Sequence, residues 1–214
     1  MHIPVDKRSV GGTIAILLLT LVLGFFLGAS ALVFAIGGCL LAVHWCFFRD
    51  PMPKTASHSP ASVVAPAQGK VVEISRVLED DYLHEPAIRI GIFLSVFDVH
   101  VTRASWGGTV KYLKYVPGKF LNALLERSAR ENESNWIGLE DGSKRVLVRQ
   151  ITGAIARRIF WDVKIGSQVQ RSEKIGMICY GSRVECYVPE RSFKVHVKLG
   201  DKVKAGETAL GEWL

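Results

Sequence analysis

The stretch Ile175-Gly176-Met177-Ile178-Cys179-Tyr180-Gly181-Ser182-Arg183-Val184 places a Gly-Ser pair between two short apolar runs. Such runs, bounded by turn residues, are typical of buried strands, so the first interpretation is a turn between two strands. The second interpretation is chemical: the hydroxyl of Ser182 attacks the carbonyl of Gly181, and the bond between these residues breaks. Glycine suits that position because it has no side chain and tolerates a strained backbone. The rest of the chain decides between the two.

An uncharged apolar segment dominates the N-terminal part. No Lys, Arg, Asp or Glu occurs from Val10 to Phe48, well beyond the roughly 18 apolar residues that mark a membrane segment. Gly28-Ala29-Ser30 predicts a hairpin of two short helices, over about Gly12–Leu27 and Ala31–Phe47. Basic residues flank the segment on both sides, which favours the cytoplasmic face of the cell membrane.

Composition narrows the partners. The 214 residues carry a net charge of +7, but the basic residues are dispersed, which fits an anionic membrane surface better than nucleic acid. The four cysteines are too few and too scattered for a disulfide framework, and no Cys/His spacing indicates zinc. We therefore expect reduced cysteines, no nucleic-acid partner and no metal.

Three regions follow from the sequence: a membrane-associated segment over 1–50, a Pro/Ser/Ala-rich linker over 51–62, and a folded domain over 63–214. A helix is predicted at Gly118–Arg130 from its leucine spacing, and a polar, turn-rich loop at Glu131–Asp141. Short runs rich in β-branched residues predict strands. These runs are Val71–Ile74, Ala87–Phe93, Thr109–Tyr115, Val146–Ile151 and Val184–Val188.

One repeat lies inside this domain. Val163-Lys164-Ile165-Gly166-Ser167-Gln168-Val169 matches Val197-Lys198-Leu199-Gly200-Asp201-Lys202-Val203. Each copy reads as strand, tight glycine turn and strand, and resembles the hammerhead turns of lipoyl- and biotin-carrier domains. The modifiable lysine of those carriers is missing at the expected tip. The repeat predicts a mainly β, sandwich-like domain with few helices, in which Gly181-Ser182 lies between the two copies.

Asp98 and His100 form the second informative pair. On a strand, residues two apart face the same side, where a carboxylate can fix the imidazole tautomer and raise its basicity. The alternative is a solvated polar pair on an edge strand. Glu131-Asn132-Glu133 indicates a solvated loop more than an acid/base cluster, and Arg157-Arg158 either binds phosphate or forms a solvated face.

Together these motifs resemble the short-form phosphatidylserine decarboxylases, a group that includes archaetidylserine decarboxylases. The resemblance covers nearly the whole chain, with the motifs in order and at the family spacing. They are Phe48-Arg49-Asp50-Pro51, Phe93-Leu94-Ser95, Asp98-Val99-His100-Val101 with Arg103, Pro117-Gly118-Lys119-Phe120, Glu131-Asn132-Glu133, Gln150-Ile151 with Gly153 and Ile155-Ala156-Arg157-Arg158, and Gly176-Met177-Ile178 before Gly181-Ser182-Arg183.

The resemblance implies a proenzyme that cuts itself between Gly181 and Ser182. Residues 1–181 would form the β chain and residues 182–214 a 33-residue α chain, held together as a heterodimer, with higher oligomers left open. Ser182 would become a covalent pyruvoyl cofactor, without metal or pyridoxal phosphate. Phosphatidylserine would be decarboxylated to phosphatidylethanolamine through a Schiff base to that group.

Residue roles follow from the same resemblance. The family position of His100 is assigned to self-cleavage and decarboxylation, with Asp98 supporting it. A guanidinium matches a phosphate or a carboxylate, so four arginines are candidates for binding the headgroup. They are Arg103, Arg157, Arg158 and Arg183.

The sequence departs from the family at Pro66-Ala67-Gln68-Gly69, where relatives usually have Asp in place of Gln68. In long-form members that Asp is proposed to join a self-cleavage triad, with a histidine where this chain has Arg103. We expect Asp98 and His100 to suffice for processing. Otherwise the protein would mature slowly. For the chain as a whole, the alternative function is that of an uncut, non-catalytic relative that binds membrane lipid, and the repeat alone would fit a tethered carrier-like interaction module.

Overall fold

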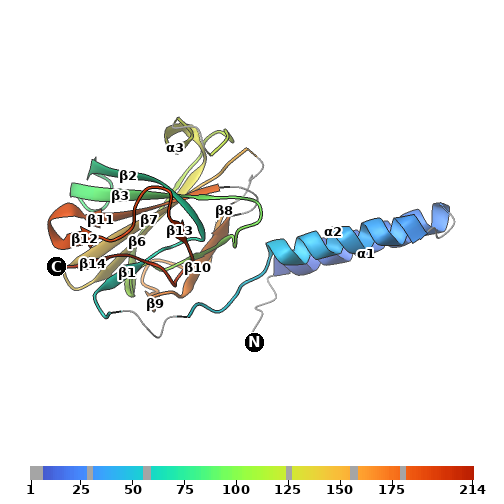
Figure 1. Ribbon diagram of the computed structural model, residues 1–214, viewed down its shortest axis with the longest axis horizontal. Coiled ribbons are helices and arrows are strands. Elements are labelled where there is room, and N and C mark those ends of the chain that lie inside the picture. The colour runs from blue at the N-terminus through green and yellow to red at the C-terminus, as the bar shows by residue number, and fades with distance from the viewer. Residues whose placement is uncertain (1–6, 28–30, 55–58, 124–126, 155–158, 179–181) are drawn as a thin grey trace. The chain divides into compact units, whose positions relative to one another are not determined.

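The structure is a computed structural model that describes residues 7–27, 31–54, 59–123, 127–154, 159–178 and 182–214. The chain divides into two compact units, Met1–Met52 and Pro53–Leu214. Figure 1 shows a helical hairpin in the first unit and a β domain in the second. The predicted linker over 51–62 contains this boundary.

The first unit consists of helix α1 (Lys7–Phe26) and helix α2 (Ala31–Phe47), close to the predicted positions. Small residues let the helices approach. A Cβ atom on Gly12 would overlap the His44 ring, and one on Gly37 would overlap the side chain of Thr20. Close contact through glycine is a common mode of helix pairing in apolar surroundings.

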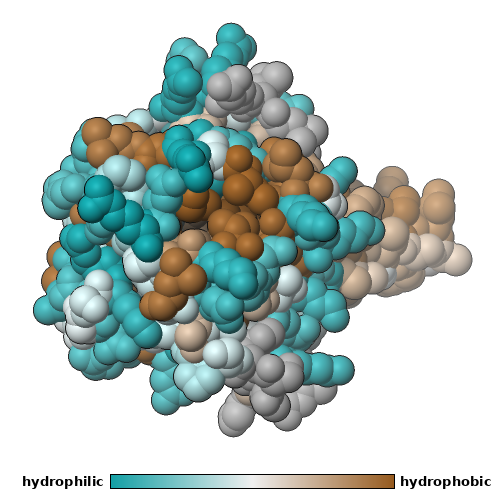
Figure 2. Space-filling model, turned by 60° about the vertical axis from the view of Figure 1, so that its left-hand side comes forward, coloured by the Kyte–Doolittle hydropathy of each residue, from teal (hydrophilic) through white to brown (hydrophobic). Residues whose placement is uncertain are grey.

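The hairpin exposes many apolar side chains. The face of the helices that is visible in Figure 2 is coloured brown and tan. Phe25, Phe26 and Leu32 are 84%, 77% and 69% exposed. Among the described residues, no helix is both long enough and apolar enough to cross a membrane. The two predicted helices are present in the structure, but their association with a membrane remains a prediction.

The second unit is built on an antiparallel sheet of eight strands that curls into a half-barrel (Figure 1). The strands at the centre of this sheet come from parts of the chain that are far apart in the sequence. From edge to edge the strands are β13 (Lys202–Val203), β2 (Gly69–Glu79), β3 (Glu85–Leu94), β11 (Ser182–Pro189), β7 (Lys144–Ile151), β6 (Ser134–Asp141), β5 (Gly108–Val116) and β9 (Gln168–Val169).

Two sheets of three strands accompany the half-barrel. One contains β1 (Ser62–Val64), β14 (Ala209–Trp213) and β12 (Phe193–Val195). The other contains β4 (Val101–Arg103), β10 (Lys174–Ile178) and β8 (Ile159–Trp161). Helix α3 (Ser128–Glu131) and a 3-10 turn (Glu190–Ser192) are the helical pieces of the described part of this unit.

The core follows from side-chain alternation along the central strands. On β11, Val184, Cys186 and Val188 are fully buried in the main apolar cluster. Burial raises the pKa of the Cys186 thiol to about 12, although contact with Ser105 acts against this shift. Cys186 is therefore a small apolar core residue, as the sequence indicated.

The sequence repeat marks two equivalent turns. Gly166 and Gly200 have φ of +88° and +93°, a region that favours glycine. The amide of Gly166 donates to the carbonyl of Val110, and the amide of Gly200 donates to that of Val71, both at 2.8 Å. Each turn leads into a two-residue strand, and these strands form opposite edges of the large sheet.

This equivalence extends through the domain as a pseudo-two-fold symmetry. Strands β1, β2, β3, β11, β12, β13 and β14 form one half, and β4, β5, β6, β7, β8, β9 and β10 form the other in matching order. The approximate axis passes between Cys186 and Val148, which are paired on the central strands. The chain leaves the first half after β3, completes the second half, and returns at β11.

Three sequence expectations need correction. The sandwich-like domain is a curled half-barrel with two small sheets. The predicted helix over Gly118–Arg130 is wrong for its first part, because the amide of Lys119 donates to the carbonyl of Glu131 at 2.7 Å and ties this segment to the chain beyond it. The predicted loop over Glu131–Asp141 contains strand β6, where Ile137 and Leu139 alternate inward and are fully buried.

Replacing Gly176 with alanine should destabilise the β domain. A Cβ atom there would overlap the main-chain oxygen of Phe160 on the neighbouring strand, and a main chain paired in a sheet cannot yield easily. We expect Gly176→Ala to lower the free energy of unfolding in urea by about 1–3 kcal/mol. The control is Gly38→Ala, where space is open and no loss is expected. Equal stability of the two variants would contradict this packing.

Candidate active site

Two connections carry the chain between the symmetric halves. Residues 95–100 lead from β3 to β4, and residues 179–181 lead back from β10 to β11. Both ends of these connections are paired: Ser182 lies opposite Leu94, and the amide of Ile178 donates to the carbonyl of His100 at 3.1 Å. The residues that flank the two connections are therefore brought together at one end of the large sheet.

Ser182 is the first residue of β11, and its side chain is fully buried. Within the described residues, its hydroxyl oxygen has no hydrogen-bond partner. Leaving a buried hydroxyl unpaired costs about 1–3 kcal/mol, so such groups are uncommon unless they serve a purpose. Gly181, the other side of the predicted cleavage bond, lies outside the described residues.

The outgoing connection is a turn, so the prediction that Asp98 and His100 share a strand is wrong. The carboxylate of Asp98 closes this turn: its Oδ2 accepts from the amide of Ser95 at 2.9 Å and from the Ser95 hydroxyl at 2.7 Å. Local bonds of this kind compete with the regular pairing of a strand. Asp98 therefore shapes the segment that carries His100.

His100 is fully buried and is oriented through the main chain. Its Nδ1 lies 2.8 Å from the carbonyl oxygen of Asp98. A carbonyl only accepts, so Nδ1 carries the hydrogen and donates it. In the neutral ring the basic nitrogen is then Nε2. The Asp98-His100 pair is thus retained with a different geometry from the one predicted, because the carbonyl of Asp98 fixes the tautomer.

Gln68 takes part in the same arrangement. Its Nε2 donates to Oδ1 of Asp98 at 3.2 Å, while Ser95 occupies Oδ2. The amide places a neutral donor beside the carboxylate, where a second carboxylate would repel it. The departure at Gln68 therefore leaves the turn that carries His100 fully supported.

The two candidate arginines that the structure describes, Arg103 and Arg183, contact groups other than Ser182. Arg103 lies opposite Lys174, at the end of β4 away from His100, and its Nη1 donates to the carbonyl of Ser172 at 3.1 Å. Arg183 follows Ser182 on a strand, so its side chain points to the opposite face of the sheet. Arg157 and Arg158 lie outside the described residues.

Arg183 belongs to a buried ionic network. Its guanidinium pairs with Glu73 and, at 2.8 Å, with Glu185, which is fully buried. The Tyr187 hydroxyl donates to the same carboxylate at 2.6 Å, and Arg149 lies 3.5 Å from it. Burial, followed by the charge of Glu185, raises the pKa of Tyr187. The charge of Arg183 is therefore compensated within the protein.

Glu73, the less buried carboxylate of this network, is also compensated by neighbouring groups. Burial opposes ionisation of Glu73, but hydrogen bonds from Ser75 and Arg183 and the charge of Arg89 outweigh it, so the pKa of Glu73 is lowered. Glu133 differs, because burial raises its pKa and a hydrogen bond with Tyr115 acts against the rise only in part. The Glu133 carbonyl accepts from the amide of Thr152, just beyond the end of β7.

Sequence reasoning missed three buried polar side chains: Thr102, Asn135 and Gln150. Nε2 of Gln150 donates to the Thr102 hydroxyl at 2.9 Å. Within the described residues, Oε1 of Gln150 and Oδ1 of Asn135 have no partner. A signal existed, since Gln150 continues the inward register of Val146 and Val148 where an apolar residue is expected.

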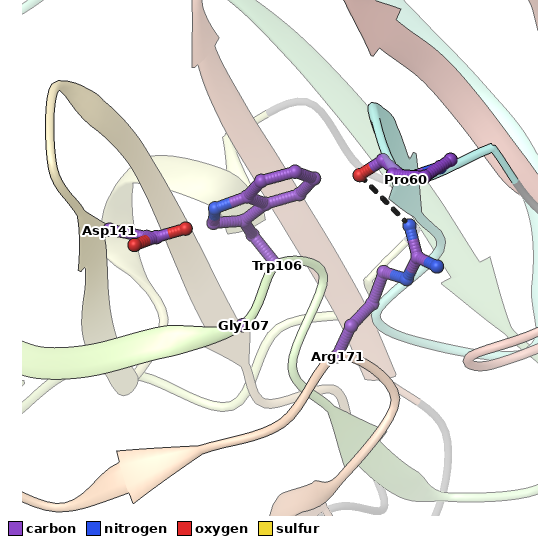
Figure 3. A pocket seen from close by; sticks show the side chains of 5 residues that line it. All are labelled: Pro60, Trp106, Gly107, Asp141 and Arg171. Carbon is purple, nitrogen blue, oxygen red and sulfur yellow. Dashed lines mark hydrogen bonds between the residues drawn. The ribbon is translucent and has the colours of Figure 1, made fainter.

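A pocket of about 310 Å³ lies elsewhere, lined by Pro60, Trp106, Gly107, Asp141 and Arg171 (Figure 3). The strand register shows that the pocket lies at the place that corresponds, through the pseudo-symmetry of the domain, to the Ser182 region. Lys144 corresponds to Ser182, since both begin a central strand, and Ala61 corresponds to His100, since both carbonyls accept from a matching amide. The counterpart therefore lacks both the hydroxyl and the imidazole.

Comparisons with known proteins identify the class of enzyme. The family model for phosphatidylserine decarboxylase matches residues 40–211. A phosphatidylserine decarboxylase proenzyme of Symbiobacterium thermophilum is 39% identical over 216 residues, covering 99% of this chain and 97% of that protein. The corresponding proenzyme of Carboxydothermus hydrogenoformans is 43% identical over 165 residues, covering 77% of each. The protein is therefore a decarboxylase. It belongs to the phosphatidylserine decarboxylase family.

Replacing Arg183 with methionine should strongly destabilise the domain, because it leaves the buried carboxylate of Glu185 poorly compensated. Breaking a buried ion pair from one side typically costs about 3–5 kcal/mol. We expect a loss of that size for Arg183→Met in urea unfolding. The control is Arg76→Met, which removes a 79%-exposed partner of Glu190 and should cost no more than about 1 kcal/mol. If both variants lose the same small amount, the network does not hold the central strands.

Proposed function

We propose that the protein decarboxylates phosphatidylserine to phosphatidylethanolamine and forms its own pyruvoyl cofactor by cutting the Gly181–Ser182 bond. The observation that carries this proposal is the paired geometry of the two connections, which brings the buried hydroxyl of Ser182 to the segment of His100. Family membership supports the same reaction, since the matching relatives are phosphatidylserine decarboxylase proenzymes.

Self-cleavage begins at Ser182. Its Oγ attacks the carbonyl carbon of Gly181, the oxygen–carbon bond forms, and the carbon–nitrogen bond of the peptide breaks. His100 takes the hydroxyl proton at Nε2 and passes it to the freed nitrogen. Residue 182 then loses its α proton while the carboxylate of Gly181 leaves from its β carbon. The resulting enamine takes up a proton at its β carbon and becomes an imine. Water then adds to the α carbon, ammonia departs, and a ketone remains at the new N-terminus.

The site suits such a group because residue 182 is buried, fixed by pairing with Leu94, and free of a hydrogen-bond partner within the described residues. A pyruvoyl group supplies a ketone that captures a primary amine and takes up the electron pair released with CO2. His100 then delivers the proton that replaces the lost carboxyl group.

The sheet explains how two fragments would remain one enzyme. Strand β11 would belong to the α chain of residues 182–214, and it lies between β3 and β7 of the β chain, residues 1–181. Hydrogen bonds on both sides and a buried apolar face would hold it after cleavage. We therefore expect a tightly associated heterodimer.

The hairpin gives the enzyme access to its substrate. Its exposed apolar side chains fit a bilayer interior, and we propose that they keep the enzyme at the cytoplasmic face of the cell membrane, where a two-chain lipid resides. Arg103, Arg157 and Arg158 remain candidates for the headgroup phosphate or carboxylate. Arg183 is no longer a candidate for binding the headgroup, because Glu73 and Glu185 already bind its guanidinium.

The test measures release of labelled CO2 from vesicles that contain phosphatidylserine labelled in the serine carboxyl group. The unaltered protein should release it, Ser182→Ala should release none, and His100→Gln should be slower by about 10²–10⁴-fold. The matched control is Ser143→Ala, which alters the exposed Gly142-Ser143 pair of the β6–β7 turn and should keep full activity. CO2 release by Ser182→Ala at the rate of the unaltered protein would refute the proposal.

A further inference from the structure

Three polar side chains, Thr102, Asn135 and Gln150, form what we call the polar floor. Thr102 and Gln150 are fully buried, and Asn135 is 3% exposed. Gln150 uses its Nε2 on the Thr102 hydroxyl at 2.9 Å, which leaves Oε1 as its open acceptor. Oδ1 of Asn135 is a second acceptor without a partner among the described residues.

Strand register places the polar floor next to Ser182, two residues further along the strands. Gln150 lies opposite Val184 on one side and opposite Asn135 on the other. Ser182 is two residues before Val184 on the same face, and such diagonal neighbours lie about 7–8 Å apart. On the facing sheet, Thr102 follows His100 by two residues. The open acceptors therefore belong to the interior that Ser182 and His100 border.

The pseudo-symmetry supplies an internal control for these three positions. Thr102 pairs with Gly176 as Val63 pairs with Gly211. Asn135 pairs with Gln150 as Ile88 pairs with Val188.

The counterparts Val63, Ile88 and Val188 are all buried in the main apolar cluster. The same fold therefore accepts apolar side chains at these places. Polar side chains are therefore not a requirement of this strand arrangement, and the unpaired oxygens of the polar floor should make it less stable than the counterpart.

The chemistry of the floor selects its ligand. Amide oxygens only accept hydrogen bonds, so they attract a donor and offer nothing to a phosphate or a carboxylate. A protonated amine has three donors and a positive charge, and hydrogen bonds to charged groups are the stronger kind. The serine headgroup carries one such amine, and the reaction requires it next to residue 182.

We propose that Gln150 and Asn135 bind the amine of the serine headgroup through Oε1 and Oδ1, with Thr102 fixing the orientation of the Gln150 amide. This inference rests on the proposed function, because it assumes a substrate with a primary amine. It assigns the amine a position beneath residue 182, separate from the arginine candidates for the phosphate and the carboxylate.

The experiment measures binding without turnover. Treatment of the mature protein with sodium borohydride reduces the ketone, so that a headgroup binds without reacting, and the probe is glycerophospho-L-serine titrated by calorimetry. Gln150→Leu should weaken its affinity by about 10–100-fold. Gln150→Glu, which keeps acceptor oxygens at this place, should bind at least as tightly as the unaltered protein. An amine-free probe, glycerophospho-3-hydroxypropionate, should bind both the unaltered protein and Gln150→Leu equally weakly.

The matched control is Gln168→Leu, which removes an exposed Gln–Thr bond of 2.7 Å to Thr109 and should leave the affinity unchanged. The inference is overturned if Gln150→Leu binds glycerophospho-L-serine as the unaltered protein does, or if it loses the amine-free probe equally. Should Gln150→Leu fail to fold, Asn135→Ile, which installs the counterpart residue, tests the second acceptor with the same probes.

Failure of this inference can be told apart from failure of the proposed function. If the protein releases CO2 but Gln150→Leu loses no affinity that depends on the amine, the proposed function stands and the assignment of the amine to the polar floor is refuted. A protein that never releases CO2 refutes the function, and the same titration on the uncut chain then shows whether the floor selects an amine.

Discussion

The site depends on one constraint, the antiparallel pairing that brackets the two crossings between the halves of the domain. Leu94 faces Ser182 at one end, and the main chain of His100 holds Ile178 at the other. A strand cannot slip by one residue without turning its buried face outward, so this register is firmly set. The sheet therefore brings Ser182 close to the segment that carries His100, and the bonds of Asp98 to Ser95 shape that segment.

The pseudo-symmetry gives the two ends of the domain the same backbone arrangement but different side chains. Both halves use the same strand order and the same glycine turns, yet Lys144 and Ala61 stand where Ser182 and His100 stand in the other half. The interior follows the same division, with a polar floor beneath Ser182 and apolar residues at the counterpart positions. The two halves therefore share the apolar faces of the scaffold and differ in the residues at these ends.

Much of the fold was predictable because local patterns dictate it. The run Val146–Ile151 alternates as a strand should, and the glycines of the repeat require the turns observed. Strand β6 was missed because polar residues precede it, and the Asp98-His100 geometry was missed because side-chain bonds to Ser95 override a strand pattern. The position of Gln150 beside Asn135 and Thr102 depends on register between strands far apart in the chain, which no local pattern contains.

We propose that this geometry drives cleavage at Gly181–Ser182, and the mass of the purified protein after denaturation tests this proposal. We expect two species, residues 1–181 and residues 182–214, the smaller one lighter by one ammonia than its serine form and blocked at its N-terminus. A single species with the mass of the intact 214-residue chain would contradict it.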